Sequence, residues 1–176
     1  MTKEIIAYPS KLFYDNKITT DESMETNLKK FIDSFTDEWK ESDISEIIDP
    51  SNPSIWVQVD SNDSNNNARK NQEEAEQCNN IIDKLLESGI EPGQIGVISP
   101  FRLQVNTIKD EVFKSLGDDR PEILDNLQID TIDRFQGSQK DVIIISLCTS
   151  DPENNFLVKD LRRFNVALTR PRFKRI

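Results

Sequence analysis

Two arginines near the end of the chain have a spacing that suits phosphate recognition. Arg163 and Arg170 are two helical turns apart in a segment with helical periodicity, which places them on one side of a helix and about 10 Å apart along its axis. Leu161, Phe164 and Leu168 occupy the opposite face. Because a guanidinium is always charged and presents a planar fork of donors, such a pair can hold phosphate oxygens. The residues alone favour the plainer interpretation, which is a solvated basic face on a helix that packs against the core.

A polar turn between two apolar segments is a second candidate for phosphate binding. The turn contains Gly137 and lies between Leu127–Ile132 and Val142–Leu147. Glycine adopts positive φ or lets another group approach the backbone closely, and neighbouring N–H groups in such a turn can cradle an anion. An ordinary loop glycine is the alternative that this residue leaves open by itself.

Strands and helices alternate in the part of the chain that must position these residues. Residues 71–176 contain short, continuously apolar segments that are typical of buried parallel strands, separated by segments with helical periodicity. The strands are predicted at Ile95–Ser99, Leu127–Ile132 and Val142–Leu147, and the helices at Gln72–Ser88, from Pro100 to Leu116, and at Asp160–Arg170. This alternation predicts an α/β fold with a parallel sheet covered on both sides.

The first 70 residues are predicted to be organised differently. Residues 1–18 indicate a short helix that begins near Pro9, and residues 19–70 form an acidic segment. Within the acidic segment we predict a helix at Met24–Trp39, a strand at Ile55–Val59 and a flexible Ser/Asn-rich loop at residues 61–67. The chain therefore divides into residues 1–18, 19–70 and 71–176.

Composition disfavours several classes of protein. The chain has 176 residues, a net charge of −10, two cysteines and no histidine, so we predict neither a disulfide framework nor a metal site. It lacks the run of about 18 apolar residues that a membrane helix needs, and we expect no membrane partner and an intracellular setting, in the cytoplasm or nucleus. Residues 159–176 carry seven Lys and Arg against one Asp, so a basic region surrounds the paired arginines despite the acidic total.

Three motifs, in this order, resemble those of superfamily 1 helicases, closest to the Upf-like branch. Residues 95–104 (Ile-Gly-Val-Ile-Ser-Pro-Phe-Arg-Leu-Gln) resemble motif IV, residues 127–137 (Leu-Gln-Ile-Asp-Thr-Ile-Asp-Arg-Phe-Gln-Gly) motif V, and residues 162–170 (Arg-Arg-Phe-Asn-Val-Ala-Leu-Thr-Arg) motif VI. The resemblance implies the C-terminal one of two RecA-like motor domains, with a three-layer fold and a mainly parallel sheet. Residues 1–18 resemble the entry segment of that domain. A further strand begins in the family near residues 173–176, so we expect the sheet to be truncated at its last strand.

The resemblance also implies roles for individual residues. Arg170 would be the arginine finger that reaches the γ-phosphate of ATP, and Arg163 a second residue on the nucleotide side. The nucleotide side would also include Gln136, Gly137 and Gln139, while Ser99, Gln104 and Thr131 would contact the backbone of a single-stranded nucleic acid. We expect Gln104 on the exposed side of its helix. ATP and Mg²⁺ are the implied cofactors of the intact enzyme, and the N-terminal RecA-like domain of the same polypeptide is the implied partner.

Two other functions remain open. The first is a degenerate helicase domain that acts as a protein-interaction module. It is suggested by three departures from the family pattern, at Asp130, Gln139 and Thr149. A stand-alone nucleotide-binding α/β protein is the second alternative, and the lack of a P-loop sequence disfavours it. Since the P-loop lysine and the magnesium ligands are expected in the first motor domain, we expect this chain alone neither to hydrolyse ATP nor to hold a nucleotide tightly.

Overall fold

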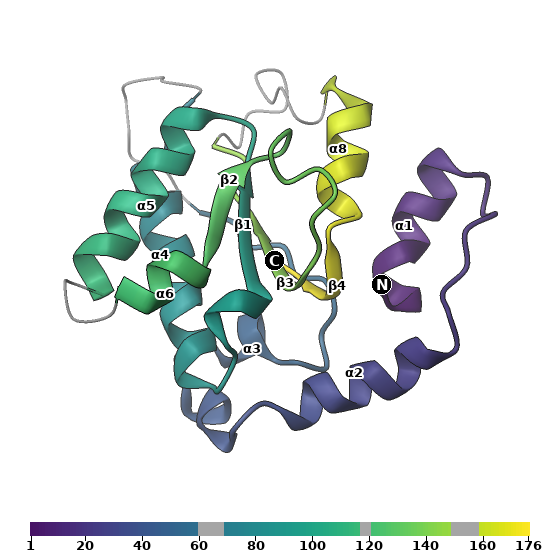
Figure 1. Ribbon diagram of the computed structural model, residues 1–176, viewed down its shortest axis with the longest axis horizontal. Coiled ribbons are helices and arrows are strands. Elements are labelled where there is room, and N and C mark those ends of the chain that lie inside the picture. Colours follow the sequence, from purple (N-terminus) through teal and green to yellow (C-terminus); the bar gives the residue numbers. More distant parts are fainter. Residues whose placement is uncertain (60–68, 117–120, 149–158) are drawn as a thin grey trace.

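A four-stranded parallel sheet lies at the centre of the computed structural model, which describes residues 1–59, 69–116, 121–148 and 159–176 (Figure 1). The strands lie in the spatial order β2-β1-β3-β4, and all three pairings are parallel. Their bounds are Ile95–Ser99 for β1, Gln128–Thr131 for β2, Lys140–Ile145 for β3 and Pro171–Arg175 for β4. The predicted α/β class is confirmed, and the architecture is consistent with a truncated RecA-like fold.

Helices lie on both faces of this sheet (Figure 1). The larger core cluster joins α4 and α5 to one face, whereas α8 packs on the other face and α1 contacts both α8 and β4. The α-helices are α1 (Lys3–Phe13), α2 (Ser23–Asp33), α3 (Ser45–Ile48), α4 (Gln72–Glu87), α5 (Arg102–Leu116), α6 (Pro121–Asn126) and α8 (Leu161–Leu168), and the 3-10 helices are η1 (Asp37–Glu41) and η2 (Pro92–Gln94).

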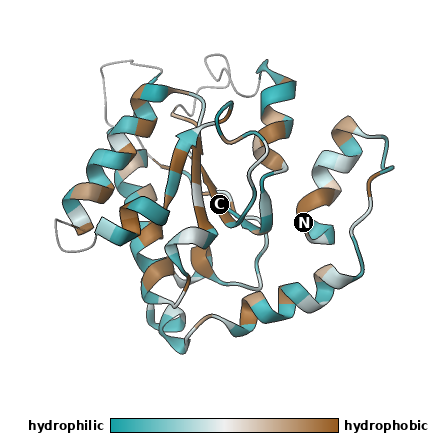
Figure 2. Cartoon of the chain, in the orientation of Figure 1, coloured by the Kyte–Doolittle hydropathy of each residue, from teal (hydrophilic) through white to brown (hydrophobic). Residues whose placement is uncertain are grey.

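The central strands are apolar because each one buries side chains on both faces of the sheet (Figure 2). Successive side chains of a strand point to opposite faces, so a strand covered on both sides needs a continuous apolar run. In β1, Val97 belongs to the cluster under α4 and α5, and Ile98 to the cluster under α8. In β3, Ile144 and Ile143 divide in the same way.

Most predicted helices are present near their predicted positions, but several begin or end at other residues than predicted. Helix α4 begins after Asn71, whose side-chain oxygen accepts from the Glu74 amide at 2.9 Å, and Gly89 follows it with φ of +91°. Helix α1 begins at Lys3 rather than near Pro9, because the Thr2 hydroxyl caps it; the proline lies inside the helix. The helix predicted from Met24 to Trp39 is two elements, α2 and η1.

The strand predicted at Ile55–Val59 does not form. Ser54 makes an isolated parallel bridge to Arg175, and the Ile55 amide donates to the Arg175 carbonyl at 2.9 Å, but no ladder continues from this pair. β4 reaches its last residue at this point, so the alternating residues that follow have no neighbouring strand to pair with. Trp56 is 74% exposed as a result. The loop predicted at residues 61–67 lies outside the described residues.

The acidic N-terminal segment contributes to the main core. Phe31 of α2 stacks on Phe173 of β4 with ring centroids 4.9 Å apart, and Ile48 of α3 is fully buried in the same cluster. The buried Lys174 side chain donates to the carbonyls of Asp49 and Asn52 at 2.9 and 2.7 Å. Burial lowers the pKa of Lys174 to about 8. These contacts hold the segment before residue 53 against the outer strand of the sheet.

Residues 173–176, where the sequence predicts that a further strand begins, lie in and directly after β4. Pro171 opens this strand, a position at which the missing N–H does not interrupt a ladder. The outer edge of β4 is bonded to the N-terminal part of the chain, through the Thr2 amide to the Arg172 carbonyl at 3.0 Å and the Arg175 amide to the Pro53 carbonyl at 2.8 Å. α8 ends at Leu168, two residues before the end of the predicted helix.

Gly96 of β1 is a position where only glycine fits. A Cβ atom there would lie 2.5 Å from Cζ of Phe135 and 2.8 Å from Cδ1 of Ile143, both well inside van der Waals contact. Both neighbours are fully buried, so neither side chain can move into solvent. We expect Gly96→Ala to lower the free energy of unfolding by about 1–3 kcal/mol, as overpacked cores do.

Gly93→Ala is the matched control for this prediction, because a Cβ atom at Gly93 meets no atom within 4 Å. Urea unfolding of the two variants gives the comparison. Equal free energies of unfolding for the two proteins would contradict the close packing of Phe135 on β1.

Candidate functional site

The carboxyl ends of β1, β2 and β3 lie together at one edge of the sheet (Figure 1). Ser99 ends β1, Thr131 ends β2, and Ser146 directly follows β3. The register pairs Ser99 with Thr131, and the Ser146 amide donates to the Ile98 carbonyl at 2.9 Å. Open parallel sheets bind their ligands at this edge, where helices and loops begin.

The loop after β2 carries the three residues assigned to the nucleotide side. Its first turn is closed by bonds from the Arg134 and Phe135 amides to the Thr131 carbonyl. Gln136, Gly137 and Gln139 are exposed on the surface of this loop. Gly137 has φ of +90°, and a Cβ atom there would meet nothing within 4 Å, so the backbone is open to an approaching group. The predicted need for glycine at this turn is therefore conformational, and the site is accessible.

The Phe135 side chain anchors this loop to the sheet. Its ring is fully buried and belongs to the small cluster formed with Ile98, Ile143 and Ala167, beneath α8. The ring sits over Gly96, whose missing side chain makes room for it. The Phe135 ring thus packs the loop, β1 and α8 against one another.

The paired arginines contact the same loop from the two ends of α8. Nη2 of Arg163 donates to Oδ2 of Asp133 at 3.1 Å, and its Nε lies 3.7 Å from Oδ2 of Asp160. Nη1 of Arg170 donates to the carbonyl of Ser138 at 3.2 Å. Asp133 and Ser138 were not singled out in the sequence, although both belong to the segment that contains Gly137.

Arg170 is held mainly by its own helix. Nε donates to the Val166 carbonyl at 2.9 Å, and Nη2 donates to Oγ1 of Thr169 at 2.9 Å. Burial lowers the pKa of the Arg170 guanidinium from its ordinary value, with a smaller opposing effect of Tyr14, and arginine still remains charged near neutral pH. Of its five N–H groups, three are used in the bonds to Val166, Ser138 and Thr169, and a guanidinium so placed has donors left for an anion.

The face of α8 opposite the arginines is less completely buried than the sequence predicts. Leu168 is buried and Phe164 packs against the small cluster, as expected. Leu161 is wrong as a core residue, since it is 58% exposed. It is the first residue of α8, one turn beyond the part of the helix that the sheet covers.

The residues assigned to nucleic acid differ in accessibility. Thr131 is half-buried at the end of β2. Gln104 was expected on the exposed side of its helix, and this is wrong: its side chain is fully buried. Its Nε2 donates to the Asn71 carbonyl at 2.9 Å and to Oγ of Ser146 at 3.1 Å. Ser99 is also buried. Of the three residues assigned to nucleic acid, only Thr131 is therefore partly exposed at the carboxyl edge of the sheet.

A buried polar network that the sequence did not reveal lies beneath this edge. It contains Gln104, Ser146 and the carboxylate of Glu74, which reaches from the first turn of α4 to the end of β3. In the sequence, Glu74 belongs to an acidic run that is most simply explained by the favourable interaction of negative charge with the start of a helix. The spacing of Asn71 and Glu74 is the available signal, since it matches a helix capping box.

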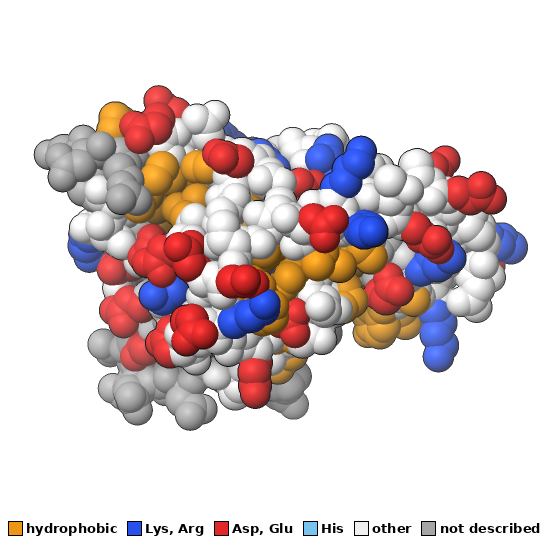
Figure 3. All heavy atoms as spheres, turned by 90° about the horizontal axis from the view of Figure 1, so that it is seen from below, with side chains coloured by type: hydrophobic (Ala, Val, Ile, Leu, Met, Phe, Trp, Pro, Cys, Tyr) orange, Lys and Arg blue, Asp and Glu red, His pale blue; other side chains and the backbone are white. Residues whose placement is uncertain are grey.

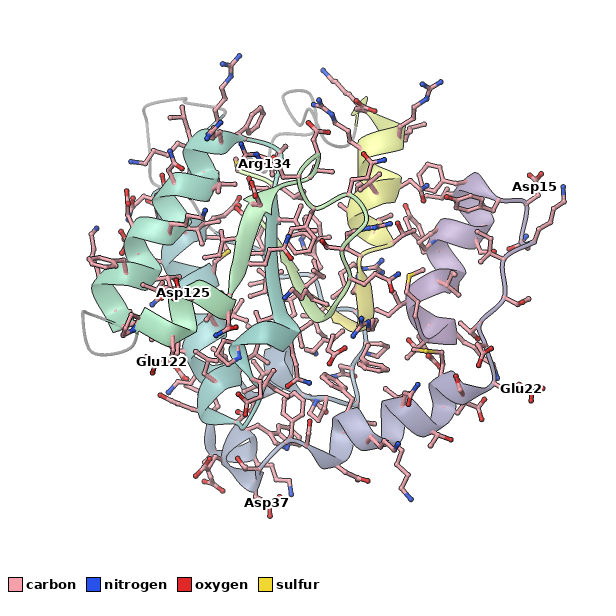
Figure 4. All side chains as sticks on the ribbon, in the orientation of Figure 1. Asp15, Glu22, Asp37, Glu122, Asp125 and Arg134 are labelled. Carbon is pink, nitrogen blue, oxygen red and sulfur yellow. The ribbon has the colours of Figure 1, made fainter. Side chains whose placement is uncertain are left out.

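Charge is unevenly arranged around the site. Arg134, at the carboxyl end of β2, is exposed near this edge, whereas the labelled acids Glu122 and Asp125 lie on α6 (Figure 4). The face seen from below in Figure 1 carries scattered acidic side chains with basic ones among them (Figure 3). The basic residues of 159–176 do not gather at this edge, because Arg172 pairs with Asp141 at the start of β3 and Lys174 is buried.

Within the described ranges, no cluster of three or more His, Cys, Asp and Glu side chains is arranged to hold a metal ion. No helix in these ranges is long and apolar enough to cross a membrane. Thr149, one of the departures from the family pattern, lies outside the described residues.

Comparison with known proteins places the whole chain in one family. Residues 1–176 match a family described as AAA domain. A stretch of 104 residues, 58% of this chain, is 42% identical to Regulator of nonsense transcripts 1 of Dictyostelium discoideum, and covers 8% of that protein. DNA polymerase alpha-associated DNA helicase A of Saccharomyces cerevisiae is 32% identical over 98% of this chain and 25% of its own length.

A human relative extends the comparison. The DNA replication ATP-dependent helicase/nuclease DNA2 of Homo sapiens is 27% identical over 100% of this chain and 17% of its own length. The chain therefore spans between 8% and 25% of the length of these three relatives.

Proposed function

Because the chain belongs to the AAA-domain family and is a superfamily 1 helicase C-terminal domain, we propose that it acts as the second motor domain of an ATP-dependent DNA or RNA helicase. In this role Arg170 is the arginine finger and Arg163 a second residue on the nucleotide side. The carboxyl edge of the sheet supplies part of a track for single-stranded nucleic acid. The N-terminal RecA-like domain of the same polypeptide is the proposed partner.

One observation carries this proposal. Arg163 and Arg170, at opposite ends of α8, both donate to the loop that contains Gly137, through Asp133 and the Ser138 carbonyl. Two guanidinium groups, of which Arg163 is paired with Asp133 and Asp160, thereby lie along the loop that contains the open Gly137 turn. This is the combination that recognition of a phosphate group requires, because each part supplies donors to its oxygens.

The residues of this surface fit the phosphates of a nucleotide. Gly137 leaves its N–H approachable, and Gln136 and Gln139 beside it present exposed amides. ATP, when bound, supplies the phosphoryl group that is transferred to water. Arg170 stabilises negative charge on that group, and Arg163 holds Asp133 in place. As the family resemblance implies, we assign the ligands of Mg²⁺ to the N-terminal motor domain.

Contact with nucleic acid is proposed at the start of α5 and at Thr131. The Thr131 hydroxyl is half-buried at the sheet edge, and the first amides of a helix favour a phosphate. Ser99 and Gln104 are too deeply buried for the same role. We assign them the task of fixing the first turn of α5 relative to β1 and β3.

A protein-interaction module remains the second candidate function. The observation that favours it is the inward bonding of Arg170, whose guanidinium is used to bind Val166, Ser138 and Thr169 of its own domain. A degenerate domain would keep these bonds for stability alone. Turnover and stability of Arg170 variants, measured together, separate the two functions.

Single-stranded nucleic acid is expected to bind this chain weakly. Half a track neutralises few phosphates, and the protein has a net charge of −10, so the dependence of affinity on salt is expected to be small. Anisotropy of labelled DNA and RNA oligonucleotides, measured between about 50 and 200 mM salt, gives both quantities. Thr131→Val, which removes only the hydroxyl, is expected to weaken binding further.

Thr19→Val is the matched control, because Thr19 is an exposed threonine in the loop between α1 and α2. It is expected to leave affinity unchanged. Tight binding that does not vary with salt would refute the backbone-contact role of the sheet edge, and so would equal affinities for the two threonine variants.

A further inference from the structure

Glu74 occupies a helix-capping position but does not make the capping bond. Asn71 caps α4, and Glu74 is its third residue, from which a carboxylate usually turns back to the N–H of the capping residue. That N–H is already taken, since the Asn71 amide donates to Oε1 of Gln104 at 2.8 Å. The Glu74 carboxylate is therefore available for another partner.

The partner is the end of β3. Oε2 of Glu74 accepts from Oγ of Ser146 at 2.6 Å and from the backbone amide of Cys148 at 2.9 Å. Cys148 has φ of +67°, in the left-handed region that non-glycine residues rarely adopt. Such a conformation is strained and persists only where the surroundings hold it. The bond from Glu74 holds it here.

Cys148 in turn touches the residue that precedes α5. Its Sγ lies 3.3 Å from Oγ of Ser99, and the same hydroxyl is 3.5 Å from the amide of Phe101 at the start of α5. The chain of contacts runs from Glu74 through Cys148 and Ser99 to the first turn of α5. This is the turn to which nucleic-acid contact was assigned above.

We propose that Glu74 is a positioning residue, which fixes Cys148 and Ser99 so that the start of α5 is presented in the geometry that binds a nucleic-acid phosphate. The proposal rests on the function proposed above. It assigns Glu74 no contact with the ligand. Loss of the carboxylate leaves the Ser146 hydroxyl and the Cys148 amide without their acceptor, and the left-handed turn relaxes.

Two measurements test the proposal on Glu74→Ala and Glu74→Gln. The first is the rate at which a thiol reagent labels Cys148, read by peptide mass spectrometry so that Cys78 is followed in the same sample. Both thiols are buried, and burial raises the pKa of the Cys148 thiol to about 12, so labelling of the unaltered protein is slow. The second is the affinity for single-stranded oligonucleotides of DNA and RNA.

Glu76→Ala is the control, because Glu76 is an exposed residue of the same helix and its replacement removes the same charge. We expect Glu74→Ala to speed labelling of Cys148 about tenfold, with Cys78 unchanged, and to weaken oligonucleotide binding about threefold or more. Glu74→Gln keeps one acceptor oxygen and is expected to lie between the unaltered protein and Glu74→Ala. Glu76→Ala is expected to change neither quantity.

Four results would overturn the proposal. Unchanged labelling of Cys148 in Glu74→Ala removes the link to β3, and equal acceleration of Cys78 indicates general loss of stability instead. Faster labelling with unaltered affinity removes the link to nucleic acid while leaving the proposed function intact. If the unaltered protein binds neither oligonucleotide, the proposed function fails first and the role of Glu74 fails with it.

Discussion

Arg170→Ala is expected to lower ATP turnover by roughly 10³-fold or more in a polypeptide that carries both motor domains, as loss of an arginine finger does in phosphoryl transfer. This corresponds to about 4 kcal/mol in the activation barrier. Arg170→Lys is expected to rescue little, since a point charge cannot reproduce the planar fork. Affinity for nucleic acid is expected to stay close to that of the unaltered protein, because Arg170 lies beside the Gly137 loop rather than at α5.

Stability must be measured on the same variants, because the Arg170 guanidinium also bonds its own domain. Arg172→Ala is the matched control: Arg172 is an exposed arginine two residues later, paired with Asp141 at 3.2 Å. Its loss is expected to leave turnover and melting temperature nearly unchanged, as for most surface ion pairs. An Arg170→Ala protein that hydrolyses ATP normally, or loses activity only in step with its melting temperature, would return Arg170 to a structural role.

Phe135→Ala is expected to give the largest loss of stability, about 3–5 kcal/mol in the free energy of unfolding. The ring is fully buried between β1 and α8, and the glycine beneath it has no side chain that could fill the cavity. A typical domain is stable by about 5–15 kcal/mol, so this single change would remove a large share of the total. The loop that carries Gly137 would lose its anchor at the same time.

Phe113→Ala provides the comparison, since Phe113 is 52% exposed on α5. Its replacement is expected to cost at most about 1 kcal/mol. Urea unfolding with a common slope for both proteins measures the difference. Similar losses for the two phenylalanines would show that the Gly137 loop is not held by the Phe135 ring.

The sheet was predictable because its strands carry a strong local signal. β1 and β3 are short runs of Val and Ile that no amphipathic helix would show, and the residues on either side are helical in period. The segment at Ile55–Val59 has an equally good local pattern and fails as a strand. Pairing is decided by the partner, and β4 ends where that segment begins to run beside it.

The site was predictable in its backbone and less so in its side chains. The family resemblance placed Arg163, Arg170 and Gly137 on one side, and in the structure both arginines bond the loop that contains Gly137. Gln104 was misplaced because its polarity suggests solvent, although it lies one turn before Ile108 on the buried side of α5. An amide is stable there only because Asn71 and Ser146 satisfy it, and such long-range partners leave no mark in a local pattern.

The bonds that the N-terminal part of the chain makes to β4 bear on how the protein behaves at high concentration. An edge strand with open N–H and C=O groups is a template for pairing with a second molecule, and so for aggregation. The Thr2 amide donates to the Arg172 carbonyl, and the Pro53 carbonyl accepts from the Arg175 amide. These bonds occupy backbone groups of β4 that another strand would otherwise use. The opposite edge strand, β2, is only four residues long, which also limits such pairing. The N-terminal part of the chain thus covers the outer edge of β4 against pairing with a second molecule.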